Sequence, residues 1–137
     1  MSPPLRRVLA VLAGVGVGVG IIFAVEAINS WLYVPPGLDL NDLDAMRAYM
    51  RELPAAALLI VLLGWGLGAL AGGWVAARVG RGFAPARWVG IILLGVALFN
   101  LLSLPHPLWF WIVGILVFVP AAELGARLAG ASPDFAG

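Results

Sequence analysis

Residues 64–77 read Gly-Trp-Gly-Leu-Gly-Ala-Leu-Ala-Gly-Gly-Trp-Val-Ala-Ala, and three of these glycines recur at every fourth position. The row consists of Gly64, Gly68 and Gly72, and Ala76 continues it. Residues four apart share one face of a helix, so this row leaves a groove into which a second backbone can pack closely. Glycine is a poor helix former in water, but an unbonded backbone is costlier still in lipid. The stretch therefore predicts a closely packed transmembrane helix.

The composition of the whole chain places much of its surface in lipid. The 137 residues are 63% hydrophobic and only 11% charged, whereas soluble domains average about 25% charged residues. Each membrane span needs roughly 20 residues, so four spans occupy most of the chain. We therefore expect one membrane domain, residues 1–137, without a large soluble part. Cysteine is absent, which excludes disulfides and thiolate metal sites.

Four apolar runs predict an all-α bundle of four transmembrane helices. The predicted spans cover about residues 8–30, 54–79, 87–104 and 108–129. The first run could instead be a secretory signal peptide, but its uncharged part, residues 8–25, exceeds the roughly 7–15 residues of such segments. Proline on both sides of His106 separates the last two spans, because the residue before a proline is disfavoured in a helix.

The loop between the first two spans contains a predicted amphipathic helix at about residues 40–53. Asp39 or Asn41 can cap its N-terminus, and acidic residues follow in the first turn, where they favour the positive end of the helix dipole. One face of this helix is apolar and carries Leu43, Met46, Met50 and Leu53. Such a helix lies on the membrane surface or caps a bundle.

The arginines predict the orientation of the chain in the membrane. Six of the eight fall on one side of the four-span arrangement: Arg6, Arg7, Arg78, Arg81, Arg87 and Arg127. The other side holds residues 31–53, with two arginines against four acids, and the short turn around His106. The positive-inside rule then places both termini in the cytoplasm, for a bacterial-type inner membrane.

Four polar residues are expected at one level near the outer ends of the first and third spans: Glu26, Asn29, Asn100 and His106. At about 1.5 Å per residue, Glu26 lies roughly 28 Å along its helix from Arg7, near the outer edge of the hydrocarbon. Ionisable residues inside spans are costly, which suggests a proton- or cation-handling site. The alternative, which the sequence alone favours, is structural. In it the amides join helices through hydrogen bonds of about 0.6–2 kcal/mol each, and the histidine faces water.

At the cytoplasmic end of the fourth span, Glu123 and Arg127 stand four residues apart. This order favours an intrahelical ion pair, and Arg78 could join it across the bundle. We interpret the group as structural.

Metal, nucleic-acid and enzymatic functions find little support in the sequence. Met46, Met50 and His106 share the outer side and would suit Cu(I), but methionines on an apolar helix face are usually packing residues, so no metal is expected. Trp65 lies near the middle of its span, where it is expected to fill space opposite glycines. No HExxH, GxSxG or Walker A motif and no basic patch occurs. We therefore expect no enzyme, no cofactor and no nucleic-acid partner.

Two functions remain after these exclusions. The first is a non-enzymatic inner-membrane protein that acts by helix association, with itself or with another membrane protein. Glycine on all four spans motivates this hypothesis. The alternative is a small transporter or channel for a proton, cation or small solute that uses the outer polar cluster.

Overall fold

The computed structural model describes residues 1–133, which form four long helices and one short one. The helices are α1 (Pro3–Tyr33), α2 (Leu43–Glu52), α3 (Ala55–Gly80), α4 (Ala84–Ser103) and α5 (Leu108–Leu128). The four long helices are apolar enough to cross a membrane. The predicted fold class, a multi-pass all-α membrane protein with a short helix between its first two spans, is confirmed. The last four residues of the expected domain lie outside the described part.

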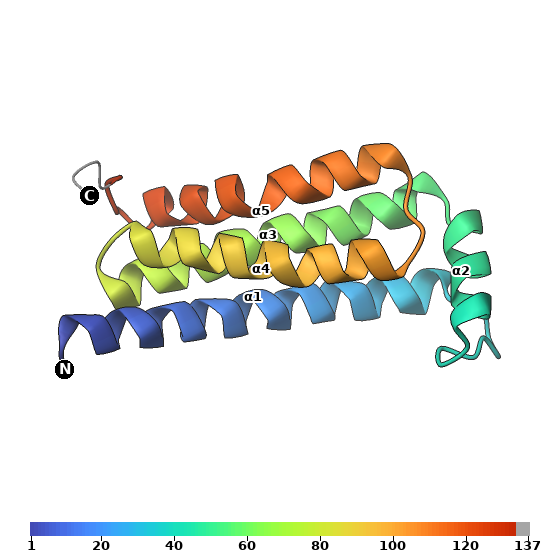
Figure 1. Cartoon of the computed structure of the whole chain (residues 1–137), viewed down its shortest axis with the longest axis horizontal. Coiled ribbons are helices and arrows are strands. Elements are labelled where there is room, and N and C mark those ends of the chain that lie inside the picture. The colour runs from blue at the N-terminus through green and yellow to red at the C-terminus, as the bar shows by residue number, and fades with distance from the viewer. Residues whose placement is uncertain (134–137) are drawn as a thin grey trace.

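The four long helices pack side by side around α3, which contacts each of the other three. The start of α1 and the end of α5 lie at one end of the bundle, and α2 crosses the opposite end (Figure 1). We call these the arginine end and the α2 end. The first carries six arginines, which lie in the terminal turns of the long helices or in the connection between α3 and α4: Arg6, Arg7, Arg78, Arg81, Arg87 and Arg127.

Two of the spans begin earlier than the apolar runs predict. α1 starts at Pro3 because Ser2 caps it, accepting a hydrogen bond from the backbone N–H of Leu5 at 3.4 Å. α4 starts at Ala84 rather than near residue 87, because Pro85 falls in its first turn, where proline is tolerated. The connection from α3 is correspondingly short.

α1 and α3 approach each other through glycines on both helices. A Cβ atom on Gly68 would lie 2.7 Å from the carbonyl oxygen of Gly18, and one on Gly72 would lie 2.5 Å from that of Gly14. Larger residues would push the backbones apart, so glycine sets the spacing here. Gly64, Gly68, Gly72 and Ala76 therefore face α1 of the same protein chain.

α5 packs on the other side of α3 in a similar way. A Cβ atom on Gly73 would overlap the backbone of Ala122, and one on Gly125 would overlap the carbonyl oxygen of Leu70. Both contacts lie in the half of the bundle nearer the arginine end. That half is therefore closed by direct contact between backbones.

Large aromatic side chains fill the core nearer the α2 end. Trp65 is 2% exposed and packs against Phe110 and Phe118, with ring centroids 5.2 and 5.3 Å away. A Cβ atom on Gly114 of α5 would lie 2.9 Å from the indole. Trp65 thus occupies the space that Gly114 leaves.

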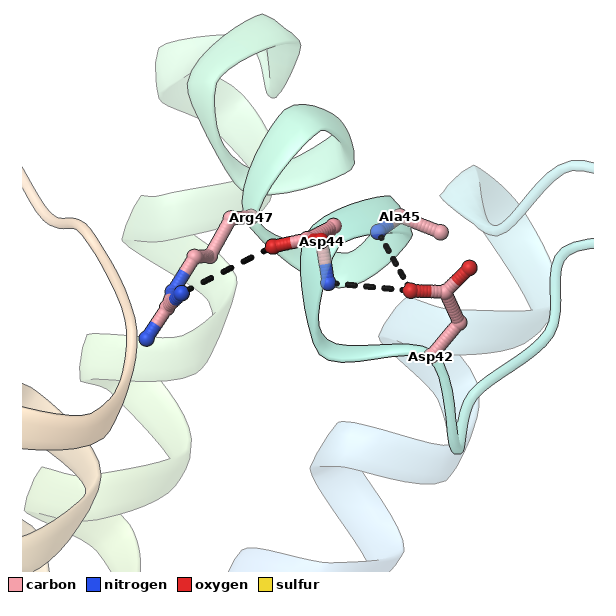
Figure 2. A network of polar contacts seen from close by, with 4 residues as sticks. All are labelled: Asp42, Asp44, Ala45 and Arg47. Carbon is pink, nitrogen blue, oxygen red and sulfur yellow. Dashed lines mark hydrogen bonds and ion pairs between the residues drawn. The ribbon is translucent and has the colours of Figure 1, made fainter.

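The N-terminus of α2 is capped by Asp42. Figure 2 shows its Oδ1 atom accepting hydrogen bonds from the backbone N–H groups of Asp44 and Ala45, at 3.0 and 3.2 Å. The sequence-based cap, Asp39 or Asn41, was wrong. Asp39 uses its carboxylate in the preceding turn, where it accepts from the N–H of Asn41 at 3.0 Å.

α2 lies across the end of the bundle without close backbone contact. No Cα atom of α2 comes within 8 Å of a Cα atom of the other described helices. Side chains bridge the gap, because Met50 and the following Leu53 pack against the hydrophobic core. Leu43, predicted for the same apolar face, is 50% exposed. The spacing between α2 and the bundle leaves room for a cavity.

Candidate functional site at the α2 end

A cavity of about 280 Å³ lies at the α2 end, between α1, α2, α4 and the turn that leads into α5. Its lining includes all four polar residues singled out in the sequence, namely Glu26, Asn29, Asn100 and His106. We call this space the polar cavity. The structure thus brings together side chains that are up to 80 residues apart in the chain.

Three helices and one turn supply the polar groups. Glu26, Asn29 and Ser30 follow one another at helical spacing on α1 and share one face. Asn100 stands in the last turn of α4. Its backbone carbonyl oxygen accepts a hydrogen bond at 3.2 Å from the backbone N–H of Leu104, the residue that caps the helix. Because each group belongs to a regular helix, its position follows from the packing of the bundle.

His106 is held in the turn between α4 and α5. Its ring stacks on Phe110, with centroids 4.7 Å apart, and its Nδ1 atom lies 2.9 Å from the carbonyl oxygen of Leu104. That contact requires a proton on Nδ1. Burial lowers the pKa of His106 below 6.5, although hydrogen bonds to the carbonyls of Leu104 and Leu101 oppose the shift. The imidazole is therefore neutral at pH 7.

The polar groups of the cavity do not satisfy one another. Among residues 1–133, no side-chain hydrogen bond joins any two of Glu26, Asn29, Asn100 and His106. The sequence-based structural interpretation needed such bonds between helices. Its premise is therefore missing in the described part of the chain.

Asn29 is the most exceptional of these residues. It is 7% exposed, and within residues 1–133 its Oδ1 atom has no hydrogen-bond partner. A buried polar atom left without a partner costs about 1–3 kcal/mol. Nearby, the half-buried Glu26 forms no ion pair with a described residue, and the Trp65 side chain lies within hydrogen-bonding reach of it. Among the described residues, the cavity therefore presents one amide oxygen without a hydrogen-bond partner and one carboxylate without a counter-ion.

A second cavity of about 190 Å³ adjoins the first toward the middle of the bundle and shares Glu26 and Asn100 with it. Two of its lining side chains, Phe23 and Val96, are largely exposed on the bundle surface. The remaining lining of this inner chamber is apolar: Val19, Ile22, Phe23, Trp65, Leu93, Val96, Ala97 and Phe118. Glu26 and Asn100 thus stand between a polar space and an apolar, partly aromatic one. Such a two-part site suits a molecule with one charged or polar group and one apolar body.

Sequence reasoning missed two residues of the site. Trp65 was expected to fill space, and no sequence feature supported a ligand-stacking role, yet this residue also lines the inner chamber. Tyr49 of α2 lines the polar cavity, and burial raises the pKa of its hydroxyl, which stays protonated at neutral pH. Its spacing of three residues from Met46 was the available signal, since it places both side chains on one side of α2.

The methionines singled out for Cu(I), Met46 and Met50, line the same cavity as His106. Over residues 1–133, no group of three or more His, Cys, Asp or Glu side chains is arranged to hold a metal ion. The cavity offers carboxylate, amide, hydroxyl and imidazole groups from separate elements. Its chemistry suits hydrogen bonding and charge pairing.

The arginine end carries a different arrangement. Glu123 pairs with Arg87 of α4, with Oε1 and Nε 2.9 Å apart. The expected partners, Arg127 and Arg78, form no ion pair in the described part of the chain; Arg78 instead lies over the ring of Trp74 at 5.5 Å. The difference arises because α4 begins at residue 84, which places Arg87 inside the helix and beside α5.

A further groove of about 380 Å³ lies at the arginine end, between α1 and α4. Apart from Arg7 its lining is apolar, and Leu12, Trp88 and Ile92 expose much of their side chains there. A surface of this kind is suited to lipid chains. It holds none of the polar groups that a specific site would need.

Comparisons with protein-family models, with curated proteins and with solved structures find no match to this chain. Its function is therefore inferred from geometry. The polar cavity offers one carboxylate, two amides, two hydroxyls and one neutral imidazole beside an apolar chamber. These groups can hold a small molecule by charge and hydrogen bonds.

Proposed function

We propose that this protein is a small, non-enzymatic solute carrier that binds its solute in the polar cavity. The observation that supports this most strongly is the buried Oδ1 atom of Asn29, which lines a cavity of about 280 Å³ and has no partner among the described residues. Native proteins rarely leave such atoms unpaired. Glu26 in the same cavity adds a charge that a solute can neutralise.

The location we propose is a bacterial-type inner membrane, with both termini in the cytoplasm. Six arginines at the arginine end support this orientation. The polar cavity then lies near the outer surface, where a solute reaches it from outside. The close backbone contacts of Gly72, Gly73 and Gly125 near the cytoplasmic end favour a carrier over an open channel.

The test of this function is solute movement into proteoliposomes. Na⁺, K⁺, an aromatic amine and an aromatic carboxylate are followed by solid-supported-membrane electrophysiology, and an aromatic alcohol by light scattering. We expect at least one solute to give a signal that Glu26→Gln or Asn100→Ala abolishes while both variants stay folded. The control is Glu52→Gln, which removes an exposed acid of α2 outside the cavity. If every signal persists in the two cavity variants, the proposed function is wrong.

A second candidate function, self-association, has one specific observation in its favour. Gly16 and Gly20 of α1 are exposed, and a Cβ atom on either would meet nothing within 4 Å. Ala13 and Ala24, also exposed, extend the row at helical spacing. α1 is also the most apolar span and the least buried one. Small residues on a lipid-facing surface favour close approach of another helix, here a second copy of α1.

This candidate is tested by energy transfer between labelled copies at low density in liposomes. We expect Gly16→Ile combined with Gly20→Ile to reduce the transfer strongly. Gly95→Ile is the matched control, because Gly95 is an exposed glycine of α4 that also has open space around it. Equal transfer in all three proteins would exclude association through this face.

A further inference from the structure

The geometry points to a protonated primary amine with a short apolar or aromatic body as the solute of this site. The inference rests on the proposed function, since it names the chemical class that the cavity binds. It places the ammonium group between Glu26 and Asn29 and the apolar body in the inner chamber.

Charge is the first argument. The lining of the polar cavity includes one carboxylate, Glu26, and no arginine. Arg47 stands beside Asp44 at 3.7 Å. Arg51 lines an adjoining cavity, also of about 280 Å³, which shares Met50 and His106 with the polar cavity. An anionic solute would meet a carboxylate without a compensating cation, whereas a cation gains an ion pair in a medium of low dielectric constant.

Hydrogen bonding narrows the class further. The Oδ1 atom of Asn29 is an acceptor, so it needs a donor from the solute. A primary ammonium carries three N–H donors, enough for Asn29 and Glu26 together. A quaternary ammonium has the charge but no N–H, so it would leave Asn29 unsatisfied.

The inner chamber argues for an organic cation over a bare metal ion. It begins at Glu26 and continues between Trp65, Phe118 and other apolar side chains. An apolar body that extends from the ammonium would move out of water into this apolar space. The two cavities, about 280 and 190 Å³, together fall in the lower part of the roughly 300–1,000 Å³ range of ligand pockets. An aryl-ethyl or short alkyl amine fits, and a peptide does not.

Calorimetric titration of the protein in nanodiscs tests the inference, with empty nanodiscs as the blank for partition into lipid. Four probes share one aromatic body: phenethylammonium, phenethyltrimethylammonium, 2-phenylethanol and 3-phenylpropanoate. We expect phenethylammonium to bind at least about tenfold more tightly than each of the others, the ratio expected from one charge-assisted hydrogen bond.

Three variants test how much of this binding preference comes from the Glu26 carboxylate and how much from the Asn29 amide. Glu26→Gln should remove the advantage of the ammonium over the alcohol. Asn29→Leu should remove its advantage over the trimethylated cation. Glu52→Gln, outside the cavity, should change neither. Thermal melting of each variant shows that a loss of binding is not a loss of fold.

The possible outcomes distinguish an error in the solute class from an error in the proposed carrier function. If the alcohol or the carboxylate binds as tightly as the amine, and Glu26→Gln weakens it, the cavity binds solutes but the amine class is wrong. Binding of the amine that is unchanged in Glu26→Gln and Asn29→Leu also overturns the inference. If none of the four probes binds, the amine is excluded, and the wider solute panel decides the proposed function independently.

Discussion

The two ends of this molecule hold the same kind of residue, a glutamate inside an apolar helix, in opposite circumstances. At the arginine end, Glu123 lies 2.9 Å from the Arg87 guanidinium, and glycines let the helix backbones touch nearby. At the α2 end, Glu26 forms no ion pair with a described residue and lines two cavities beside the unpaired Asn29. The glutamate at the first end is paired with a cation, and the glutamate at the second end has no counter-ion among the described residues.

This contrast has a thermodynamic consequence. Pairing an acid with a neighbouring cation stabilises the fold, whereas an unpaired buried acceptor lowers stability. Real proteins break such local rules at functional sites. Substitutions at the two ends should therefore have opposite effects on stability and on binding.

The largest expected effect is at the closed end of the bundle. Gly72→Leu forces a side chain against the backbone of α1, where even a Cβ atom would lie 2.5 Å from the Gly14 carbonyl oxygen. We expect a loss of about 1–3 kcal/mol or more in the free energy of unfolding, from overpacking. Reversible unfolding in mixed detergent measures it, and Gly95→Leu, with open space around the residue, is the control. Wild-type stability in Gly72→Leu would mean that α1 and α3 do not touch there.

The two glutamates give the next test, because the same substitution should act differently at each end. Glu123→Gln weakens a partly exposed ion pair, so we expect a loss of about 1 kcal/mol in unfolding free energy. Glu26→Gln has no such pair to lose and should leave stability unchanged or raise it. Both are measured by the same unfolding assay. A larger loss in Glu26→Gln than in Glu123→Gln would contradict the contrast between the ends.

Asn29→Leu should stabilise the free protein while it removes the preference for the primary ammonium over the trimethylated one. Replacing a buried amide that lacks a partner by an apolar group of similar size removes a penalty, and we expect a gain of about 1 kcal/mol. The control is Asn41→Leu, since Asn41 is exposed and should give no gain. A clear loss of stability in Asn29→Leu would indicate that its amide is satisfied in the native protein.

The smallest expected effect concerns pH. The folded protein holds the pKa of His106 below 6.5, so the unfolded chain binds the proton more readily. Its contribution to stability is complete above pH 6.5 and is lost as pH falls through the lowered pKa. Melting temperatures between about pH 7.5 and pH 5 should fall less in His106→Gln than in the wild type.

Other charged groups near His106 must be held constant in that experiment. Glu26 and Tyr49 line the same cavity, and Arg51 lines the adjoining hollow. Tyr49, with its raised pKa, stays neutral over this pH range. The comparison is therefore made in a Glu26→Gln background. If the melting temperature depends on pH in the same way with and without His106, the histidine does not cause the loss of stability at low pH.

Much of the architecture could be predicted because lipid imposes its demands on each helix separately. Length and apolar character located the four spans, and turn residues located α2. Counting residues along helices of fixed rise placed Glu26 and Asn100 at one level, and the structure puts both on one cavity.

The details that escaped prediction depend on contacts between elements. Glu123 finds Arg87 only because Pro85 allows α4 to start early. The inward turn of Trp65 toward the inner chamber depends on the space beside Gly114. Neither relation has a signature in the local sequence, because each requires the mutual positions of two helices.

Nuclear magnetic resonance of the protein in nanodiscs can observe both ends of the bundle in one sample. Phenethylammonium is titrated while the side-chain amide signal of Asn29 and the Nε–H signal of Arg87 are followed. We predict that the Asn29 signal shifts and saturates, that the Arg87 signal stays in place, and that Glu26→Gln abolishes the shift. A stationary Asn29 signal at concentrations that saturate binding, or an equal shift at both ends, would contradict a binding site at the α2 end.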